Sequence, residues 1–419
     1  MTTTIVTGVG VAAPNGVGTE EYWRATLAGR TGIGPISGFD ASRYSVKLAG
    51  EVELDAAAYI PGKFHAQTDH MTQLAMAATA MALEDSCVVP STLPEFDMGV
   101  TVANSSGGIM YGQRELQALW SRGPNHISAY MAVAFFYAAT AGQLSIRYGM
   151  KGPAIVLAAE QAGGLDAVGH ARRQVRRGTP LMVTGGSDAS LSPAGLVSQI
   201  CTGMLSTQSN PARAYVPFDR DADGYLPGNG GAILILEDAT AAQARGVVDY
   251  YGEIAGYAST FDRCVDSDEP VTEVTVFDPP RGARESRLRR AIELALADAG
   301  IGPSEVDVVF ADAWGLRSVD MEEADAIAGI FGARGVPVTA PKTMTGRLYA
   351  AGGALDLVTA LLSIRDQIIP PTVNVTSQAA GIELDLVLNK PRPHRLANAL
   401  VLARGLGGFN SAVVVTAPK

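Results

Sequence analysis

Two stretches of this 419-residue chain are followed, in the same order, by two similar stretches further along it. Residues 82–108 resemble residues 295–316, because both stretches have the pattern of a helix end, a Pro-containing loop, an apolar strand and a polar turn, in that order. Residues 154–178 resemble residues 337–367, since each reads as a strand, a polar elbow, a Gly/Ala-rich stretch and a helix. Such a repeat predicts two related halves, with the two elbows in related positions and facing one site.

Strand-like and helix-like segments alternate along the whole chain, which predicts α/β architecture. The length exceeds that of one simple domain, so two core-sized units or one large layered fold are expected. The similar segments separate near the Asp- and Arg-rich residues 261–287. We therefore expect an N-terminal half at residues 1–260 and a C-terminal half at residues 261–419.

The composition excludes several classes of protein. Hydrophobic residues make up 47% and charged residues 18%, which suits a globular chain with a large interior. The net charge is −10 and no Lys/Arg-rich run dominates a segment, so nucleic acid is not expected as a partner. Three scattered cysteines form no CxxC pair, which favours the cytoplasm over an oxidising compartment. No signal peptide and no apolar run of membrane-spanning length is present, so no membrane is expected as a partner.

The segment "LAAEQAGGLDAVGH", residues 157–170, predicts a strand, a tight turn and a helix start. Such an elbow often presents a nucleophile, because the exposed N–H groups and the dipole of the helix start favour an anionic side chain. The residue at the apex is Gln161, whose neutral amide cannot be activated as Cys or Ser can. The five histidines show no metal-ligand spacing, so no metal site is expected.

Four ordered motifs carry a resemblance to the β-ketoacyl synthases, and it spans essentially the whole chain. The elbow "GPAIVLAAEQAGGLDAVGHA" is followed by "PFDRDADGYLPGNGGAILILE", "PKTMTGRLYAAGG" and "ARGLGGFNSAVVV". The resemblance implies the thiolase fold, a five-layer αβαβα sandwich of two related halves that works as a dimer. It also implies that no cofactor is bound, because the family's substrates are carried on the phosphopantetheine of an acyl carrier protein.

The departures from the family pattern concern its catalytic residues, a Cys and two His. Aligned on the motifs, the Cys position holds Gln161 and the two His positions hold Asp312 and Arg347, whereas the family's Lys is retained as Lys342. Decarboxylation of malonate needs donors that stabilise an enolate, and a carboxylate at position 312 has the wrong charge. This pattern resembles the chain length factors, the β subunits of type II aromatic polyketide synthases. The resemblance implies a non-catalytic subunit paired with a ketosynthase α subunit.

Two alternatives stay open. Some loading ketosynthases carry Gln in place of Cys and decarboxylate malonyl-carrier protein, although those enzymes keep both His residues. The second alternative is a purely structural protein with no substrate contact.

Residues 109–122 predict a helix that ends at Gly123 and presents Ile109, Gly112, Leu116 and Trp120 on one face. A glycine within a helix costs about 1 kcal/mol relative to Ala, so something must approach closely there, either a neighbouring element or a ligand. In the chain length factors the equivalent helix lines the polyketide tunnel. The resemblance therefore implies that Ile109, Gly112 and Leu116 form the gate. Residues 130–142 are the candidate for the facing wall, with Val133 as a lining residue in it. These small and medium side chains predict a roomy tunnel and a long product.

Overall fold

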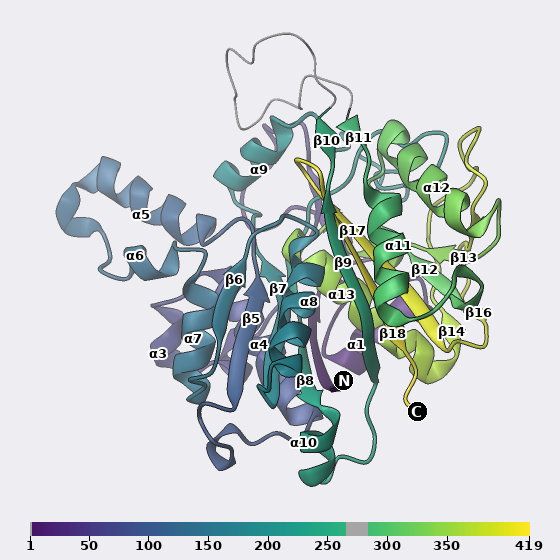
Figure 1. Cartoon of the computed structure of the whole chain (residues 1–419). Coiled ribbons are helices and arrows are strands. Elements are labelled where there is room, and N and C mark those ends of the chain that lie inside the picture. The colour runs from purple at the N-terminus through teal and green to yellow at the C-terminus, as the bar shows by residue number, and fades with distance from the viewer. Residues whose placement is uncertain (1, 265–283) are drawn as a thin grey trace.

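The computed structural model describes residues 2–264 and 284–419. Its main strands form two groups of five that run in matching order, β6-β5-β7-β8-β1 and β13-β12-β17-β18-β9 (Figure 1). The N-terminal strands are β1 (Thr4–Ala13), β5 (Met98–Ala103), β6 (Ala154–Leu157), β7 (Leu181–Asp188) and β8 (Gly230–Asp238). The C-terminal strands are β9 (Gly252–Phe261), β12 (Val308–Phe310), β13 (Pro337–Thr339), β17 (Asn398–Gly405) and β18 (Phe409–Thr416).

The strand directions also repeat between the two groups. β5 pairs in parallel with β6 and β7, and β8 pairs antiparallel with β7 and β1. In the same way, β12 pairs in parallel with β13 and β17, and β18 pairs antiparallel with β17 and β9. The internal repeat predicted from the sequence is confirmed. The groups join where Ile5 and Val6 of β1 meet Glu253 and Gly252 of β9.

Helices lie between the two strand groups and on both outer faces. α8 (Gly163–Arg176) and α13 (Ala350–Asp366) contact strands of both groups and form the central layer. α4 (His70–Asp85) and α7 (Ala139–Tyr148) cover the N-terminal group, and α11 (Leu288–Ala299), with α12 (Arg317–Phe331) beside it, covers the C-terminal group. The five-layer αβαβα sandwich is confirmed. Every residue of α13 from Ala350 to Ile364 is buried, as its almost uniformly apolar sequence requires.

The segment between β5 and β6 is one place where the two halves differ. Between β5 and β6 the chain forms α5 (Ile109–Arg122) and the short α6 (Met131–Ala134), which project from the body beside the N-terminal group (Figure 1). We call residues 109–137 the arm. α5 ends at Gly123 with φ 95°, as predicted, and Pro124 follows. In the C-terminal half, the equivalent position between β12 and β13 holds only α12.

The remaining elements are peripheral to the site. They are β2 (Gly16–Val17), α1 (Thr19–Leu27), β3 (Ile33–Pro35), β4 (Leu48–Gly50), α2 (Ala56–Tyr59), α3 (Gly62–His65), α9 (Pro193–Ile200), α10 (Ala239–Ala244), β10 (Arg263–Cys264), β11 (Arg284–Glu285), β14 (Ile368–Ile369), β15 (Asp385–Leu386) and β16 (Arg392–Pro393), with short 3-10 turns between them. Most of the predicted junction at residues 261–287 lies outside the described residues, so the division at 260/261 stays a prediction. No helix within residues 2–264 or 284–419 has the length and apolar character needed to cross a membrane.

The central helices touch through small residues. A Cβ atom added at Gly164 of α8 would lie 2.3 Å from the carbonyl oxygen of Ala350 and 2.8 Å from the nitrogen of Ala354, both on α13. These distances are too short for any side chain, so the two helices can cross this closely only with glycine at position 164.

We expect Gly164→Ala to lower the free energy of unfolding by about 1–3 kcal/mol, because the new methyl group forces the central helices apart. Urea unfolding of the purified chain measures this. The matched control is Gly142→Ala in α7, where nothing lies within 4 Å of the added Cβ. That change should be neutral or stabilise by about 0.4–1 kcal/mol. Equal effects of the two substitutions would contradict the packing argument.

Candidate functional site

The elbow predicted between residues 157 and 170 is present. β6 ends at Leu157, the backbone turns sharply at Glu160 with φ 50°, and α8 begins at Gly163. The Gly163 N–H donates to the Glu160 carbonyl oxygen at 3.0 Å, which closes the turn. Gln161 lies at the apex and is fully buried.

The side chain of Gln161 points toward the start of α13. A Cβ atom added at Gly352 would lie 2.4 Å from Gln161 Nε2, so the amide packs against the glycine backbone there. Within the described part of the chain, neither the amide nitrogen nor the amide oxygen of Gln161 has a hydrogen-bond partner. Because a neutral amide provides no nucleophile, the apex cannot start covalent catalysis.

Arg347 forms an ion pair with Asp312 beside this apex. Asp312 follows β12, and Arg347 lies on the second elbow, between β13 and α13. Arg347 Nη1 donates to both the side chain and the carbonyl oxygen of Asp312, each at 3.0 Å, and Nη2 donates to the Arg404 carbonyl oxygen at 3.0 Å. The guanidinium also stacks over the Trp314 ring, 4.5 Å from its centroid. Both side chains of the ion pair are buried, so each charge is held by the other.

The charges around Arg347 keep it ionised. Burial alone would lower the pKa of Arg347, but the carboxylates of Asp312 and Glu160 reverse this and raise the pKa above its ordinary value. The two elbows therefore do face one site, as the repeat predicted. An arginine held this way is a fixed positive charge and cannot exchange protons as a histidine does.

Lys342 is held by the same part of the fold. Its Nζ donates to the carbonyl oxygens of Ala311 and Asp312 at 2.8 and 2.9 Å and lies 2.7 Å from Asp356 Oδ2. Burial raises the pKa of Asp356 to about 6, although Lys342 opposes this rise. Two hydrogen bonds to the loop after β12 and the ion pair with Asp356 of α13 let Lys342 tie this loop to α13.

The arm is attached close to this site. Asp188, at the end of β7, accepts hydrogen bonds from the backbone N–H groups of Ser105 and Ser106 at the root of the arm, and from the Ala350 N–H of α13 at 3.0 Å. Burial raises the pKa of Asp188 to about 6 despite these donors. One buried carboxyl group thus links the start of the arm to the second elbow.

All four predicted gate residues lie on the arm. They are separate from the elbow cluster, by which we mean Glu160, Gln161, Asp312, Lys342 and Arg347. Gly112 is buried, Ile109 is partly buried, and Leu116 and Val133 are 41% and 45% exposed. The close approach predicted at Gly112 is present: a Cβ atom there would lie 2.4 Å from Cδ2 of Phe135. The neighbour is therefore the ring of Phe135, which is itself 48% exposed. The glycine at position 112 indicated a close neighbour, but the sequence alone did not identify that neighbour as Phe135.

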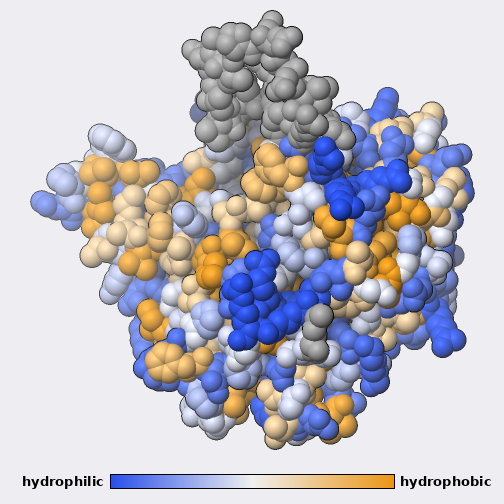
Figure 2. All heavy atoms as spheres, viewed as in Figure 1, coloured by the Kyte–Doolittle hydropathy of each residue, from blue (hydrophilic) through white to orange (hydrophobic). Residues whose placement is uncertain are grey.

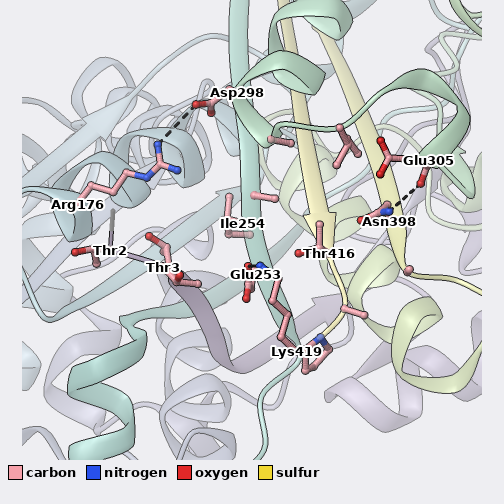
Figure 3. A pocket seen from close by; sticks show the side chains of 17 residues that line it. Thr2, Thr3, Arg176, Glu253, Ile254, Asp298, Glu305, Asn398, Thr416 and Lys419 are labelled. Carbon is pink, nitrogen blue, oxygen red and sulfur yellow. Dashed lines mark hydrogen bonds and ion pairs between the residues drawn. The ribbon is translucent and has the colours of Figure 1, made fainter.

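A separate hollow of about 520 Å³ lies where both chain ends meet β9, and its lining includes no residue of the elbow (Figure 3). Four of its charged side chains are paired, Arg176 with Asp298 at 3.7 Å and Lys419 with Glu253 at 3.1 Å. Within the described residues, no group of three or more His, Cys, Asp or Glu side chains is placed to hold a metal ion.

Residues 2–242 match the family described as the β-ketoacyl synthase N-terminal domain, and residues 251–376 match its C-terminal domain. The chain belongs to the β-ketoacyl synthase family. It is 54% identical to the actinorhodin polyketide putative β-ketoacyl synthase 2 of Streptomyces coelicolor over 98% of both chains. It is 52% identical to the tetracenomycin polyketide synthase ketoacyl synthase beta subunit of Streptomyces glaucescens, over 98% of this chain and 97% of that one.

Solved structures of the family have the same fold. The ishigamide ketosynthase/chain length factor superposes with a TM-score of 0.88 at 26% identity, over the full length of both chains. A type II polyketide synthase ketosynthase, solved in complex with its acyl-carrier protein and bound to the hexaketide, superposes with a TM-score of 0.86 at 28% identity, again over both full lengths.

We expect Asp312→Asn to lower the free energy of unfolding by about 3–5 kcal/mol, because it leaves the buried Arg347 without its carboxylate partner. The double variant Asp312→Asn with Arg347→Met should lose less than the sum of the two single changes, since neither charge is then left unpaired. Urea unfolding of the four proteins measures the coupling. Strictly additive losses would show that the ion pair is not the interaction that holds these loops together.

Proposed function

We propose that the chain is the non-catalytic β subunit, or chain length factor, of a type II polyketide synthase. In this function it pairs with a ketosynthase α subunit and forms part of the wall of the tunnel that holds the growing polyketide. The observation that carries the proposal is the Asp312–Arg347 ion pair beside the amide of Gln161. Together these residues fill the three positions at which the family places its Cys and two His, and none of them can replace those groups.

The relatives support both parts of this proposal. Chains 52–54% identical to this one are named for actinorhodin and tetracenomycin polyketide synthesis, and one is named as a beta subunit. A structural neighbour is a ketosynthase/chain length factor, and another is a ketosynthase in complex with its acyl-carrier protein. We propose that the nucleophile lies on the partner subunit, and that malonyl units arrive on the phosphopantetheine of an acyl carrier protein, with no cofactor bound by this chain. We also propose a cytoplasmic location, because the three scattered cysteines form no CxxC pair.

The arm is the surface that fits such a partner. Large apolar side chains are exposed on it and just beyond it, and Figure 2 shows apolar spheres among polar ones on the protruding part of the molecule. They are Leu116, Trp120, Tyr130, Val133, Phe135, Phe136, Tyr137 and, on α7, Ile146. Exposed apolar surface of this extent is typical of protein–protein interfaces.

The alternative function is a Gln-type decarboxylase that acts on malonyl-carrier protein. It would need hydrogen-bond donors that stabilise an enolate beside the thioester. Arg347 is such a donor, but its Nη1 already donates a hydrogen bond to the Asp312 carboxylate and its Nη2 donates one to the Arg404 carbonyl oxygen. The charge of Asp312 would also oppose the negative charge that develops in the reaction.

We expect the purified chain to release no carbon dioxide from malonyl-carrier protein above the rate without protein, because Gln161, Asp312 and Arg347 cannot replace Cys, His and His. A radiometric assay of carbon dioxide release measures this. Turnover that is lost in Gln161→Ala would instead establish the decarboxylase.

We expect Trp120→Asp to weaken association with a co-expressed ketosynthase α subunit about 30-fold or more, because Trp120 is 83% exposed on the apolar arm and aromatic anchors dominate such interfaces. Size-exclusion chromatography and a dissociation constant measure this. The matched control is Val248→Asp, since Val248 is equally exposed at 85% but lies on the loop between α10 and β9. A loss of association in the control, or none in Trp120→Asp, would contradict this interface.

In the proposed tunnel, the ring of Phe135 fills the space beside Gly112. In the proposed function, chain growth stops when the end of the polyketide meets packed atoms, since overpacking is unfavourable. The length of the product should therefore depend on the ring of Phe135 as well as on Ile109, Gly112, Leu116 and Val133.

We expect Phe135→Ala to shift the reconstituted pair to products with more ketide units, because it removes the ring that covers Gly112. Leu116→Trp should shift the products to fewer units, because it adds bulk on the same helix. Mass spectrometry of the unreduced products measures both shifts in the number of ketide units. Intact and active complexes whose products keep the wild-type length would show that the arm is not the gate.

A further inference from the structure

Two backbone N–H groups, one from each half of the chain, converge on a single oxygen at the elbow. The Gln161 N–H donates to Glu160 Oε2 at 2.8 Å, and the Leu406 N–H donates to the same oxygen at 3.1 Å. Leu406 follows β17 and Gln161 precedes α8, so the two donors are brought together only by the tertiary fold. A pair of backbone donors aimed at one point is the geometry that enzymes use to hold the oxygen of an acyl group.

The position of this donor pair matches an acyl site. One donor belongs to the residue at the apex of the elbow, where a nucleophile would be placed, and the other comes from the turn between β17 and β18. A carbonyl carbon attached to an apex side chain would therefore have its oxygen within reach of both N–H groups. In this chain the oxygen that fills the position is part of the chain itself.

The backbone at Glu160 is shaped to deliver that oxygen. Its φ of 50° is an uncommon conformation for a residue with a side chain, and it turns the carboxylate back over the N–H of the next residue. Gly405 lies directly against this turn, because a Cβ atom there would be 2.5 Å from the Ala159 carbonyl oxygen and 3.2 Å from Glu160 Cβ. The turn after β17 can approach the elbow this closely only with glycine at position 405.

The surrounding charge holds Glu160 in place. Burial raises the pKa of Glu160, but the positive charge of Arg347 and the N–H groups of Gln161 and Leu406 oppose the rise. The same Arg347 is tied to Asp312. Charge-assisted hydrogen bonds to a carboxylate are stronger than those to a neutral carbonyl, so an acyl group would compete poorly for these two donors.

We propose that Glu160 is a built-in ligand whose carboxylate occupies an acyl-oxygen site formed by the Gln161 and Leu406 N–H groups, and so closes the elbow of this chain to acyl substrates. The ligand class that this site takes when Glu160 is removed is a carboxylate or carbonyl oxygen. This function is distinct from the lack of a nucleophile, because it blocks binding and not only reaction. It depends on neither a partner subunit nor a polyketide.

The test is chemical rescue of Glu160→Ala in the full-length chain. Acetate should bind the emptied site, so the unfolding temperature of Glu160→Ala should rise with acetate concentration and saturate, whereas sodium chloride of equal ionic strength should not reproduce the rise. In protein labelled with ¹⁵N-leucine, the amide proton of Leu406 should shift downfield during the same titration. Wild-type protein should show neither effect, because Glu160 already occupies the site.

The matched control is Glu51→Ala. Glu51 also accepts two backbone N–H groups, from Ser37 and Gly38 at 2.8 and 3.3 Å, but it follows β4 and its donors are not the two N–H groups of the elbow. Its removal should give no acetate-dependent shift at Leu406. A Glu160→Ala protein that shows no saturable acetate response at Leu406 would overturn the proposal.

A second variant keeps the test decisive if Glu160→Ala does not fold. Glu160→Gln retains an oxygen acceptor but removes the charge, so the Leu406 amide proton should move upfield relative to wild type as its hydrogen bond weakens. An unchanged Leu406 resonance in Glu160→Gln would overturn the proposal. Neither result depends on association with a ketosynthase α subunit, so failure here would leave the proposed function untouched.

Discussion

The packing of α8 against α13 is the interaction on which the rest of the structure depends. The two helices form the central layer, and each touches strands of both groups. Because Gly164 lets them cross in close contact, their N-termini meet at one place, and the two elbows that precede them meet there as well. The site is therefore a consequence of how the duplicated halves are packed together.

What occupies that site is a set of buried, paired charges. Arg347 holds Asp312, Lys342 holds Asp356, and the donors at the apex hold Glu160. A buried ion pair adds little net stability compared with apolar side chains of the same volume, but it is strongly destabilising to break. The elbow cluster thus fixes the geometry of the loops tightly without offering any group that could react.

The sequence predicted the fold well because the signals it contains are local and repeated. The strand, elbow and helix order of residues 154–178 and 337–367 appears in the structure as β6–α8 and β13–α13. The pairing of Asp312 with Arg347 could not be predicted, since the residues lie 35 positions apart and only the fold brings them together. Glu160 was missed because a charged residue at a turn usually faces solvent. Phe135 was missed because one exposed ring cannot be told from the core-like residues around it.

Asp188 marks the boundary between the core, whose packing is constrained, and the arm, whose side chains can vary in size. It joins the root of the arm to the start of α13, so the segment that leads into the arm is tied to the core by hydrogen bonds. Beyond that root the arm lies outside the sandwich, and the side chains that line it can change size without disturbing the sheets. In the proposed function, single substitutions along the arm could therefore give a family of proteins different product lengths while the fold stays constant. Diversity of products would then arise from a segment that has no counterpart between β12 and β13.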